Sequence, residues 1–151
     1  MAEYFAQEGV ATKEEFFVLV GSPAQLKQRP GLKKHIDKNI LLKDRPKYIS
    51  FEGYVRPDTF RFYESDTIED ILRRLFLERE KEFTPKLLED IEKTKYSVHE
   101  ILTLASIVER EVRGKEDREK VADLFLRRLE KGWALQADST VHYISGRNGD
   151  V

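Results

Sequence analysis

Two glutamates, Glu109 and Glu111, stand in a mostly apolar segment, and they are the main candidates for acid–base chemistry in the sequence. On a helical wheel at about 100° per residue, the apolar side chains of residues 98–112 cover an arc of roughly 220°. Both glutamates project into that arc, towards its opposite margins. A carboxyl group in an apolar environment keeps its proton more readily, because desolvation disfavours the charged form. Such a group can act as a general acid.

A structural ion pair explains the same pattern equally well. An unpaired buried charge is strongly destabilising, and four arginines could supply the partner: Arg73, Arg113, Arg127 and Arg128. Spacing alone leaves both interpretations open. Either the segment carries a catalytic acid, or it belongs to a non-catalytic helical binding module in which Glu109 and Glu111 form buried ion pairs.

Several further helices must surround this segment, because an apolar arc of that width indicates a helix that is central and buried on most sides. Capping residues predict three of them: Thr12 with Glu15 ahead of 14–20, Asp66 or Thr67 ahead of a helix to about residue 82, and Thr84-Pro85 ahead of a helix to about residue 93. A long helix is also predicted over 117–131. Residues 133–143 look too irregular for a clean helix.

The stretch 48–62 has a different character, since it is rich in Tyr, Ile, Phe and Val and is interrupted by Arg56-Pro57-Asp58. Such a pattern favours two short strands around a Pro-Asp turn. The predicted fold class is therefore α+β and mainly helical. It has a buried central helix over 98–112, flanked by helices, with short strands around 48–62.

The composition narrows the classes of function. The 27 basic and 28 acidic residues of this 151-residue chain nearly cancel, so no excess positive charge exists to bind nucleic acid. Cysteine is absent, and His35, His99 and His142 lack metal-ligand spacing, so neither a metal nor a cofactor is predicted. The charged fraction of 36% exceeds the usual value of about 25%, which suits a thermophilic source.

The sequence also bears on localisation. No apolar run approaches the ~20 residues of a membrane span, and no signal-peptide pattern opens the chain. The chain is therefore expected to be either cytosolic or a soluble piece of a larger protein.

Three ordered blocks of sequence resemble one known family. Residues 102–111 (LTLASIVERE) resemble the active-site helix of the YceG-like, MltG-type endolytic murein transglycosylases. Residues 52–62 resemble that family's E-G-aromatic-x-x-P-D-T-aromatic segment, and residues 117–143 resemble the segment that follows the active-site helix. The resemblance, which covers about 51–146, implies a partial catalytic domain over 51–151 that is truncated at its C-terminus. Residues 1–50 are then an upstream segment or subdomain.

The resemblance implies roles for individual residues. Glu111 matches the family's catalytic acid and Glu109 becomes a supporting residue. Glu111 would protonate the oxygen leaving C1 of an N-acetylmuramoyl unit and would then take the proton from the C6 hydroxyl of that sugar. This cleaves the MurNAc-GlcNAc bond and gives a 1,6-anhydro-MurNAc end. Residues expected to bind substrate or support the site are Glu52, Tyr54, Asp58, Gln136, Asp138, Thr140 and Tyr143.

The family match implies a cellular setting as well. The parent protein would be anchored in the cytoplasmic membrane through an N-terminal segment that is missing here, with this domain on the outer side. Its partners would be peptidoglycan glycan strands and cell-wall synthases. In one respect the chain departs from the pattern, because Ser139 stands where the family's Q-x-D-P-T run has proline.

Two other enzymatic readings stay open beside this one. An aminodeoxychorismate lyase would need pyridoxal phosphate, and the sequence has no Gly-rich phosphate loop leading into a helix. A two-carboxylate glycoside hydrolase would differ in its products, which would carry reducing ends instead of anhydro ends.

Overall fold

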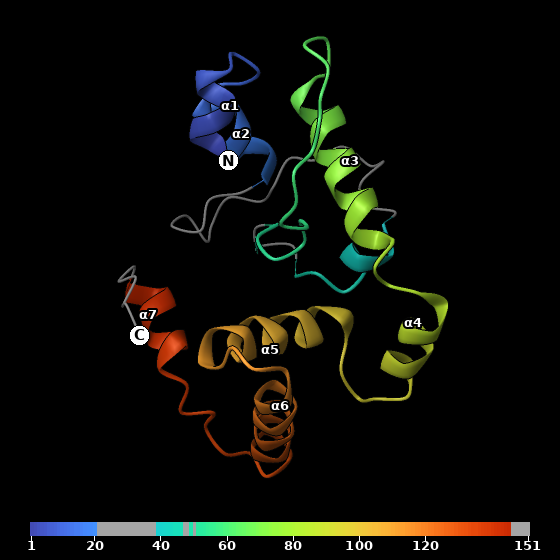
Figure 1. The fold of residues 1–151 in the computed structure, drawn as a ribbon, viewed down its shortest axis with the longest axis vertical. Helices are drawn as coiled ribbons and strands as arrows, with labels where there is room; N and C mark the ends of the chain where they lie inside the picture. Colours follow the sequence, from blue (N-terminus) through green and yellow to red (C-terminus); the bar gives the residue numbers. More distant parts are fainter. Residues whose placement is uncertain (21–38, 47–48, 50, 146–151) are drawn as a thin grey trace. The chain divides into compact units, whose positions relative to one another are not determined.

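The computed structural model describes residues 1–20, 39–46, 49 and 51–145, in which the chain forms seven α-helices and one short 3₁₀ helix (Figure 1). The chain divides into two compact units, Met1–His99 and Glu100–Val151. The described part of the chain is thus mainly helical, as predicted. Among its helices, none combines the length and the apolar character needed to cross a membrane.

The first unit begins with a pair of short helices, α1 (Ala2–Gln7) and α2 (Lys13–Val20). They pack through Phe5 and Phe16, whose ring centroids are 5.8 Å apart. The predicted capping box at the start of α2 is confirmed. The Glu15 amide donates to Thr12 Oγ1 at 3.1 Å, and the Thr12 amide donates to Glu15 Oε2 at 2.8 Å. The backbone and side-chain hydrogen bonds from Thr12 lower the pKa of Glu15.

The core of the first unit surrounds α3 (Ile68–Glu80), which begins at a capping box formed by Thr67 and Asp70. One face of α3 is buried, through Ile71, Leu72, Leu75 and Phe76. The 3₁₀ helix η1 (Ile40–Leu42) is tied to the end of α3, because both carboxylate oxygens of Glu80 accept hydrogen bonds from Asn39 and Ile40, at 3.0 and 3.3 Å. The predicted helix start at residue 67 is confirmed.

The two strands predicted around 48–62 are not seen in the described part of that stretch, residues 49 and 51–62; Tyr48 lies outside it. Its aromatic residues Phe51 and Tyr54 instead belong to a turn. Phe51 and Tyr54 are almost fully buried, and the Tyr54 amide closes the turn by donating to the Phe51 carbonyl at 3.1 Å. Gly53 has a φ of +82°, which only glycine adopts without strain. In the described residues these rings are buried against side chains of the helices instead of in a sheet; the Phe51 and Phe76 ring centroids are 5.0 Å apart.

A further helix, α4 (Pro85–Glu92), follows in the same unit and confirms the prediction made from its cap. The Thr84 hydroxyl accepts from the Leu87 amide at 3.2 Å, and Pro85 occupies the first turn, where no intrahelical amide is needed.

The second unit is built on α5 (Val98–Glu111), whose first two residues belong to the first unit, and on α6 (Lys115–Glu130) and α7 (Asp138–Ser145). Its core consists of Val108, Phe125 and Ala137, against which pack Leu104, Ile107, Val112, Val121, Ala122 and Leu135. The predicted helix over 117–131 is confirmed by α6. The irregularity predicted for 133–143 holds only as far as residue 137, since α7 follows it. The sequence Asp138-Ser139-Thr140 could have predicted the start of α7, because Asp, Ser and Thr are common at helix N-termini.

The prediction that α5 is buried on most sides is wrong for the described structure. Within the apolar arc, Val98 and Val108 are buried and Ile107 is half-buried, but Ala105 is exposed. In the second unit, α5 packs on one face only, against α6 and the segment that leads to α7. A wide apolar arc shows what a helix could bury, whereas the number of neighbouring elements decides what it does bury.

Candidate active site

Glu111 is the last residue of α5, and its side chain is exposed. The dry environment predicted for its carboxyl group is therefore absent from this structure. The physical reason is its position, because the apolar cluster covers α5 around Leu104 and Val108 and Glu111 lies beyond it. Instead, Oε1 of Glu111 accepts a hydrogen bond from the backbone amide of Ser139, at 3.3 Å.

The hydrophobic cluster explains why residues 28 positions apart in the chain meet here. Ala137, which directly precedes α7, is buried with Val108 of α5 and Phe125 of α6. Anchoring Ala137 in this way fixes the first turn of α7 beside the C-terminal end of α5 (Figure 1). Burial of a few apolar side chains thus positions a polar contact at the surface.

The connection from α6 to α7 is held by Arg128. Its guanidinium group donates to the Leu135 carbonyl oxygen, and also to Gln136 Oε1 at 3.2 Å. Gln136 has a φ of +54° and is, within the described ranges, the one residue other than glycine with a positive φ. This left-handed conformation costs about 1–2 kcal/mol, which the packing of the flanking Leu135 and Ala137 offsets.

The C-terminal end of α5 and the N-terminal end of α7, whose helix dipoles have opposite electrostatic effects, both lie beside the Glu111 carboxyl group. The carbonyl groups at the end of α5 disfavour negative charge, whereas the amides at the start of α7 favour it. The Ser139 amide is one of these donors. The Glu111 carboxyl group is therefore exposed, with Oε1 accepting a hydrogen bond from a backbone amide and Oε2 not involved in that hydrogen bond. Such a group is suited to exchanging a proton with a bound substrate.

Several other predicted residues of the second unit lie in the same short stretch. Asp138 is the exposed first residue of α7, next to the donor amide. The Thr140 amide and hydroxyl both donate to the Ala137 carbonyl, at 3.1 and 2.7 Å, so Thr140 stabilises the turn. Gln136 is engaged by Arg128. The fold therefore gathers Glu111, Gln136, Asp138 and Thr140, of which Gln136 and Thr140 already have local hydrogen-bond partners.

The remaining two predicted residues of this unit, Glu109 and Tyr143, are exposed on α5 and α7. Glu109 lies two residues before Glu111, which places it roughly 200° around the helix. It therefore points away from the side of α5 that Glu111 occupies. The site has one carboxyl group on α5, and Glu109 does not form a pair with it.

The alternative with buried ion pairs does not match the described structure. Both Glu109 and Glu111 are exposed, and neither forms an ion pair with a basic side chain of the described residues. Arg127 instead pairs with Asp123 on its own helix, at 2.9 Å. The described ranges also contain no group of three or more histidine or acidic side chains placed to hold a metal ion.

Tyr54, predicted to bind substrate or support the site, is a core residue of the first unit. Its side chain is 2% exposed, so in this structure its ring has no face open to a sugar, and a supporting role for Tyr54 stays a prediction. Its hydroxyl lies 2.7 Å from Nδ1 of His99, and the two rings are nearly parallel, at 5°. Burial raises the pKa of Tyr54 to about 12.

The raised pKa of Tyr54 predicts a stability loss in alkali. The unfolded chain ionises near the ordinary value of 10.0 and the folded chain near 12, so folding retains this contribution below pH 10 and loses it between these values. We expect the free energy of unfolding to fall by about 2 kcal/mol from about pH 9 to about pH 12. Urea midpoints at both pH values measure it. Tyr54→Phe should lose this dependence, and an unchanged dependence would contradict the assignment.

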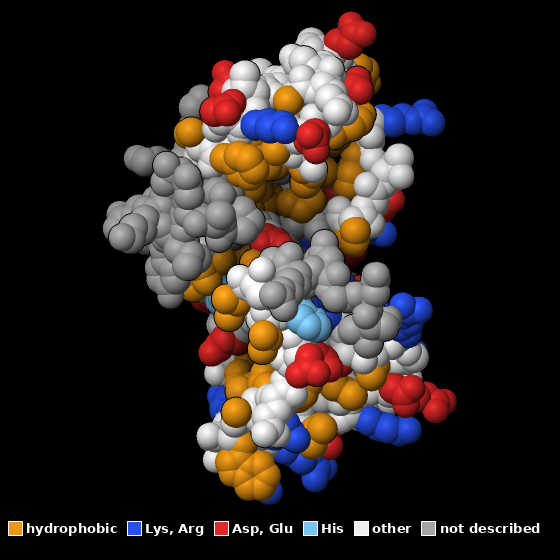
Figure 2. Space-filling view, turned by 90° about the vertical axis from the view of Figure 1, so that its left-hand side faces the viewer, with side chains coloured by type: hydrophobic (Ala, Val, Ile, Leu, Met, Phe, Trp, Pro, Cys, Tyr) orange, Lys and Arg blue, Asp and Glu red, His pale blue; other side chains and the backbone are white. Residues whose placement is uncertain are grey.

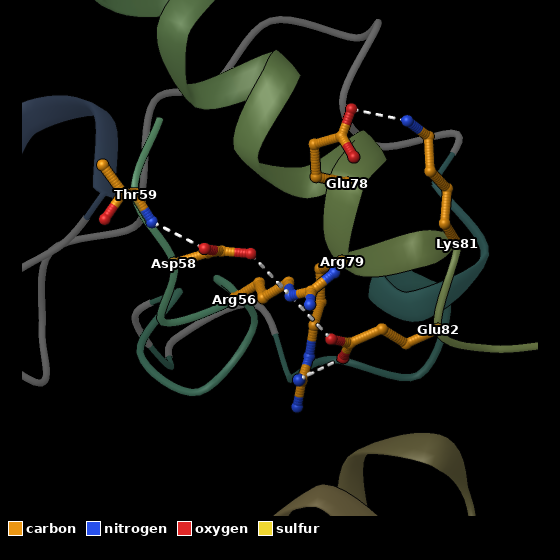
Figure 3. Close-up of polar contacts among 7 residues, drawn as sticks. All are labelled: Arg56, Asp58, Thr59, Glu78, Arg79, Lys81 and Glu82. Carbon is orange, nitrogen blue, oxygen red and sulfur yellow. Dashed lines mark hydrogen bonds and ion pairs between the residues drawn. The ribbon is translucent and has the colours of Figure 1, made fainter. Parts of the chain in front are cut away.

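Asp58, also predicted to bind substrate or support the site, belongs to an ion-pair network of the first unit (Figure 3). Arg56 Nε lies 3.3 Å from Asp58 Oδ2 and 3.0 Å from Glu82 Oε1, and Glu82 also pairs with Arg79. The other oxygen of Asp58 accepts from the Thr59 amide at 2.8 Å. Both oxygens of Asp58 are therefore engaged within the 56–59 segment, and Arg56 links that segment to Glu82, which follows α3.

Glu52, the third predicted residue of the first unit, is exposed in the turn that contains Gly53. The predicted site residues are thus divided between the two units: Glu52, Tyr54 and Asp58 belong to Met1–His99, and the others belong to Glu100–Val151. Two contributors to the second group, the Ser139 amide and Arg128, were not predicted as site residues. A backbone donor has no residue-type signal, and Arg128 was considered only as one of four arginines that could pair with a glutamate.

Comparison with known proteins provides an independent line of evidence. A family model described as the YceG-like family matches residues 2–150. An endolytic murein transglycosylase of Bacillus subtilis is 39% identical over 100 residues, which make up 66% of this chain and 28% of that protein. Endolytic murein transglycosylases of two Streptococcus pneumoniae strains are 30% and 29% identical over 138 residues. These alignments cover 91% of this chain and 25% of each relative.

The chain therefore spans about a quarter of the length of the curated relatives it matches. No solved structure matches it.

Proposed function

This chain belongs to the YceG-like family, and we propose that it supplies the acid–base residue of an endolytic peptidoglycan lytic transglycosylase. The observation that carries the proposal is the position of Glu111. Glu111 is the last residue of α5, the helix that contains the segment resembling the family. Its side chain is exposed, and its carboxyl group accepts a hydrogen bond from the first turn of α7. Relatives named endolytic murein transglycosylases support the choice of murein as substrate.

The first proposed step is protonation of the leaving group. Glu111, in its neutral form, donates its proton to the glycosidic oxygen between MurNAc and GlcNAc, and the bond from that oxygen to C1 of MurNAc breaks. The carboxylate that remains still accepts the hydrogen bond from the Ser139 amide. A hydrogen bond to a charged acceptor is stronger than one to a neutral acceptor, so the developing charge is stabilised.

The second proposed step closes a ring within the substrate. The carboxylate of Glu111 takes the proton of the C6 hydroxyl of the same MurNAc unit, and that oxygen forms a bond to C1. The product carries a 1,6-anhydro end, Glu111 is protonated again, and no water is consumed. Because the nucleophile belongs to the reacting sugar, its approach loses little entropy. One carboxyl group is sufficient, which agrees with the position of Glu109 on another side of α5.

Because Glu111 is exposed, the bound substrate itself would have to exclude water from its carboxyl group. A glycan strand lying over the carboxyl group would exclude water from it, and exclusion of water favours the neutral acid needed for the first step. On the face shown in Figure 2, acidic and basic side chains are interspersed, with no large region of one sign. Recognition of a sugar chain would therefore depend on hydrogen bonds and apolar contacts.

The proposal extends to cellular placement. Murein lies outside the cytoplasmic membrane, so we propose that this domain acts on the outer side, in a protein held by a membrane anchor. Cell-wall synthases that produce new glycan strands are the proposed partners. Glu52 and Asp138 are proposed as residues that support strand binding.

Digestion of purified, uncrosslinked glycan strands tests the proposed function. We expect long strands to shorten through internal cuts, and mass spectrometry to find new ends that are one water molecule lighter than reducing ends. Release of single disaccharides from strand termini would contradict the endolytic assignment. New reducing ends would indicate a two-carboxylate hydrolase instead.

A further inference from the structure

We infer that Trp133 forms a remote glycan-binding subsite, in which a sugar unit of the murein strand stacks on the exposed indole ring, several units away from the bond that is cleaved. This inference rests on the proposed function, since it concerns the strand that Glu111 is proposed to cleave. It makes a residue outside the acid–base site a determinant of strand length.

The indole ring of Trp133 is open for a side chain of its size, with 61% of it exposed. Among the described residues of the second unit, the exposed aromatic side chains are Trp133 and Tyr143, whereas Phe125 lies in the core. The Nζ atom of Lys131 lies over one face of the indole, 4.8 Å from its centroid. The exposed fraction leaves the opposite face available to a ligand.

The backbone that carries the indole is fixed by the C-terminal cap of α6. Gly132 has a φ of +67°, and its amide donates to the Leu129 carbonyl at 3.1 Å. The Trp133 amide donates to the Arg128 carbonyl at 2.8 Å. These two hydrogen bonds form a Schellman motif, in which the residue after the glycine often packs its apolar side chain on the helix. Trp133 occupies that position with most of its ring exposed, so the cap does not account for a tryptophan here.

Arg128 connects this cap to the candidate active site. Its carbonyl accepts from the Trp133 amide, and its guanidinium group donates to the Leu135 carbonyl. Leu135 packs against the cluster of Ala137, which places the start of α7 beside Glu111. The indole and the Glu111 carboxyl group are therefore held by one set of contacts within the second unit.

The indole lies at the far end of α6 from Glu111, because α6 starts soon after Glu111 and ends shortly before Trp133. The 16 residues of α6 span about 24 Å, at about 1.5 Å per residue. Several pyranose units of a glycan strand are needed to cover that length. A strand that contacts both groups must extend well beyond the cleaved bond, which agrees with the internal cuts proposed above.

The chemistry of murein sugars suits an exposed indole. The ring substituents of GlcNAc and MurNAc are mostly equatorial, so C–H groups make up the faces of each pyranose ring. An indole offers a large and rigid apolar surface, and few rotatable bonds lose freedom when a ligand binds it. Stacking at this distance leaves the Glu111 carboxyl group unchanged. Trp133 is therefore expected to act on strand binding and not on proton transfer.

The fluorescence of Trp133 tests the contact directly, because it is the single tryptophan of the chain. In Glu111→Gln, which should bind strands without cleaving them, we expect uncrosslinked glycan strands to shift the emission to shorter wavelengths. An equal concentration of free disaccharide should leave the emission unchanged. Strands that bind, as judged by sedimentation, without altering the emission would overturn the inference. A shift that follows protein concentration alone would also overturn it, since a second copy of the chain would then cover the indole.

Cleavage kinetics test what the indole contributes to binding. We expect Trp133→Ala to raise KM for long strands about tenfold and to keep kcat within about twofold of the wild type. Trp133→Phe keeps an aromatic ring and should recover most of that loss. Both variants retain the backbone amide of the cap, and urea midpoints identify a variant that is destabilised. The fluorescence titration then decides.

Tyr4→Ala is the matched control, because Tyr4 on α1 is an aromatic residue of similar exposure, 59%. We expect its KM to stay within about twofold of the wild type. An unchanged KM in Trp133→Ala, or an equal increase in Tyr4→Ala, would overturn the inference.

These measurements separate the subsite from the reaction. Strands that shift the emission but are not cleaved, or that yield reducing ends, would overturn the proposed function and support the subsite. Internal cuts that yield anhydro ends, with an unchanged KM in Trp133→Ala, would support the function and overturn the subsite.

Discussion

Glu111→Gln is expected to reduce the rate of glycan cleavage by a factor of about 10³ or more, because the same side chain acts as acid and then as base. The glutamine side chain keeps an oxygen that can accept the hydrogen bond from the Ser139 amide. It has no acidic proton to give to the leaving oxygen, however, and it cannot take up the C6 proton. Since Glu111 is exposed, the free energy of unfolding should change by no more than about 0.5 kcal/mol. Cleavage assays and urea titrations measure the two quantities.

Glu109→Gln is the matched control for this experiment. It makes the same chemical change two residues away on the same exposed helix end, but on another side of α5. We expect it to retain most of the activity, with a loss of less than about tenfold. Substantial cleavage by Glu111→Gln, or a larger loss in Glu109→Gln, would show that Glu111 is not the acid. A large loss of stability in Glu111→Gln would instead indicate a structural role.

Phe125→Ala is expected to have the largest effect on stability in the second unit, lowering its free energy of unfolding by about 3–4 kcal/mol. Phe125 is 5% exposed and lies in the cluster with Val108 and Ala137. Removing its ring leaves a cavity in the cluster that places Ala137, and therefore the start of α7, beside Glu111. Cleavage should weaken with stability, because the Ser139 contact depends on that packing.

Leu124→Ala provides the control, since Leu124 precedes Phe125 on α6 and is 47% exposed. Its truncation removes little buried surface, and we expect a loss of less than about 1 kcal/mol. Urea denaturation of both variants, followed by circular dichroism, measures the difference. Equal losses in the two variants would show that the Val108–Phe125–Ala137 cluster does not stabilise the unit.

The helices could be predicted largely from local signals. Thr12, Thr67 and Thr84 each cap a helix where the sequence predicts one, because capping depends on residues within one turn. The strands around 48–62 could not be judged locally, since a strand requires a pairing partner. Their aromatic residues supply core rings at Phe51 and Tyr54 instead. The burial of α5 was overestimated for a related reason, because burial depends on neighbours far away in sequence.

The candidate site shows the same division between local and long-range information. Glu111 stands out in the sequence because an acidic residue interrupts an apolar pattern. Its partner could not be predicted, because the Ser139 amide reaches Glu111 only after Ala137 packs against α5 and α6. Asp58 was predicted from its motif to bind substrate or support the site, and in the structure its carboxylate is held by Arg56 and Thr59. Residue type predicts chemistry here, whereas tertiary packing decides which groups are available for it.

Digestion of glycan strands in water labelled with heavy oxygen tests the central claim most directly. If Glu111 transfers the C6 proton and the sugar's own oxygen attacks C1, the new ends contain no oxygen from the solvent. We expect unlabelled 1,6-anhydro ends from the wild-type protein, and no new ends from Glu111→Gln. One heavy oxygen atom in each new end would show that water attacks C1, and it would contradict the proposed reaction.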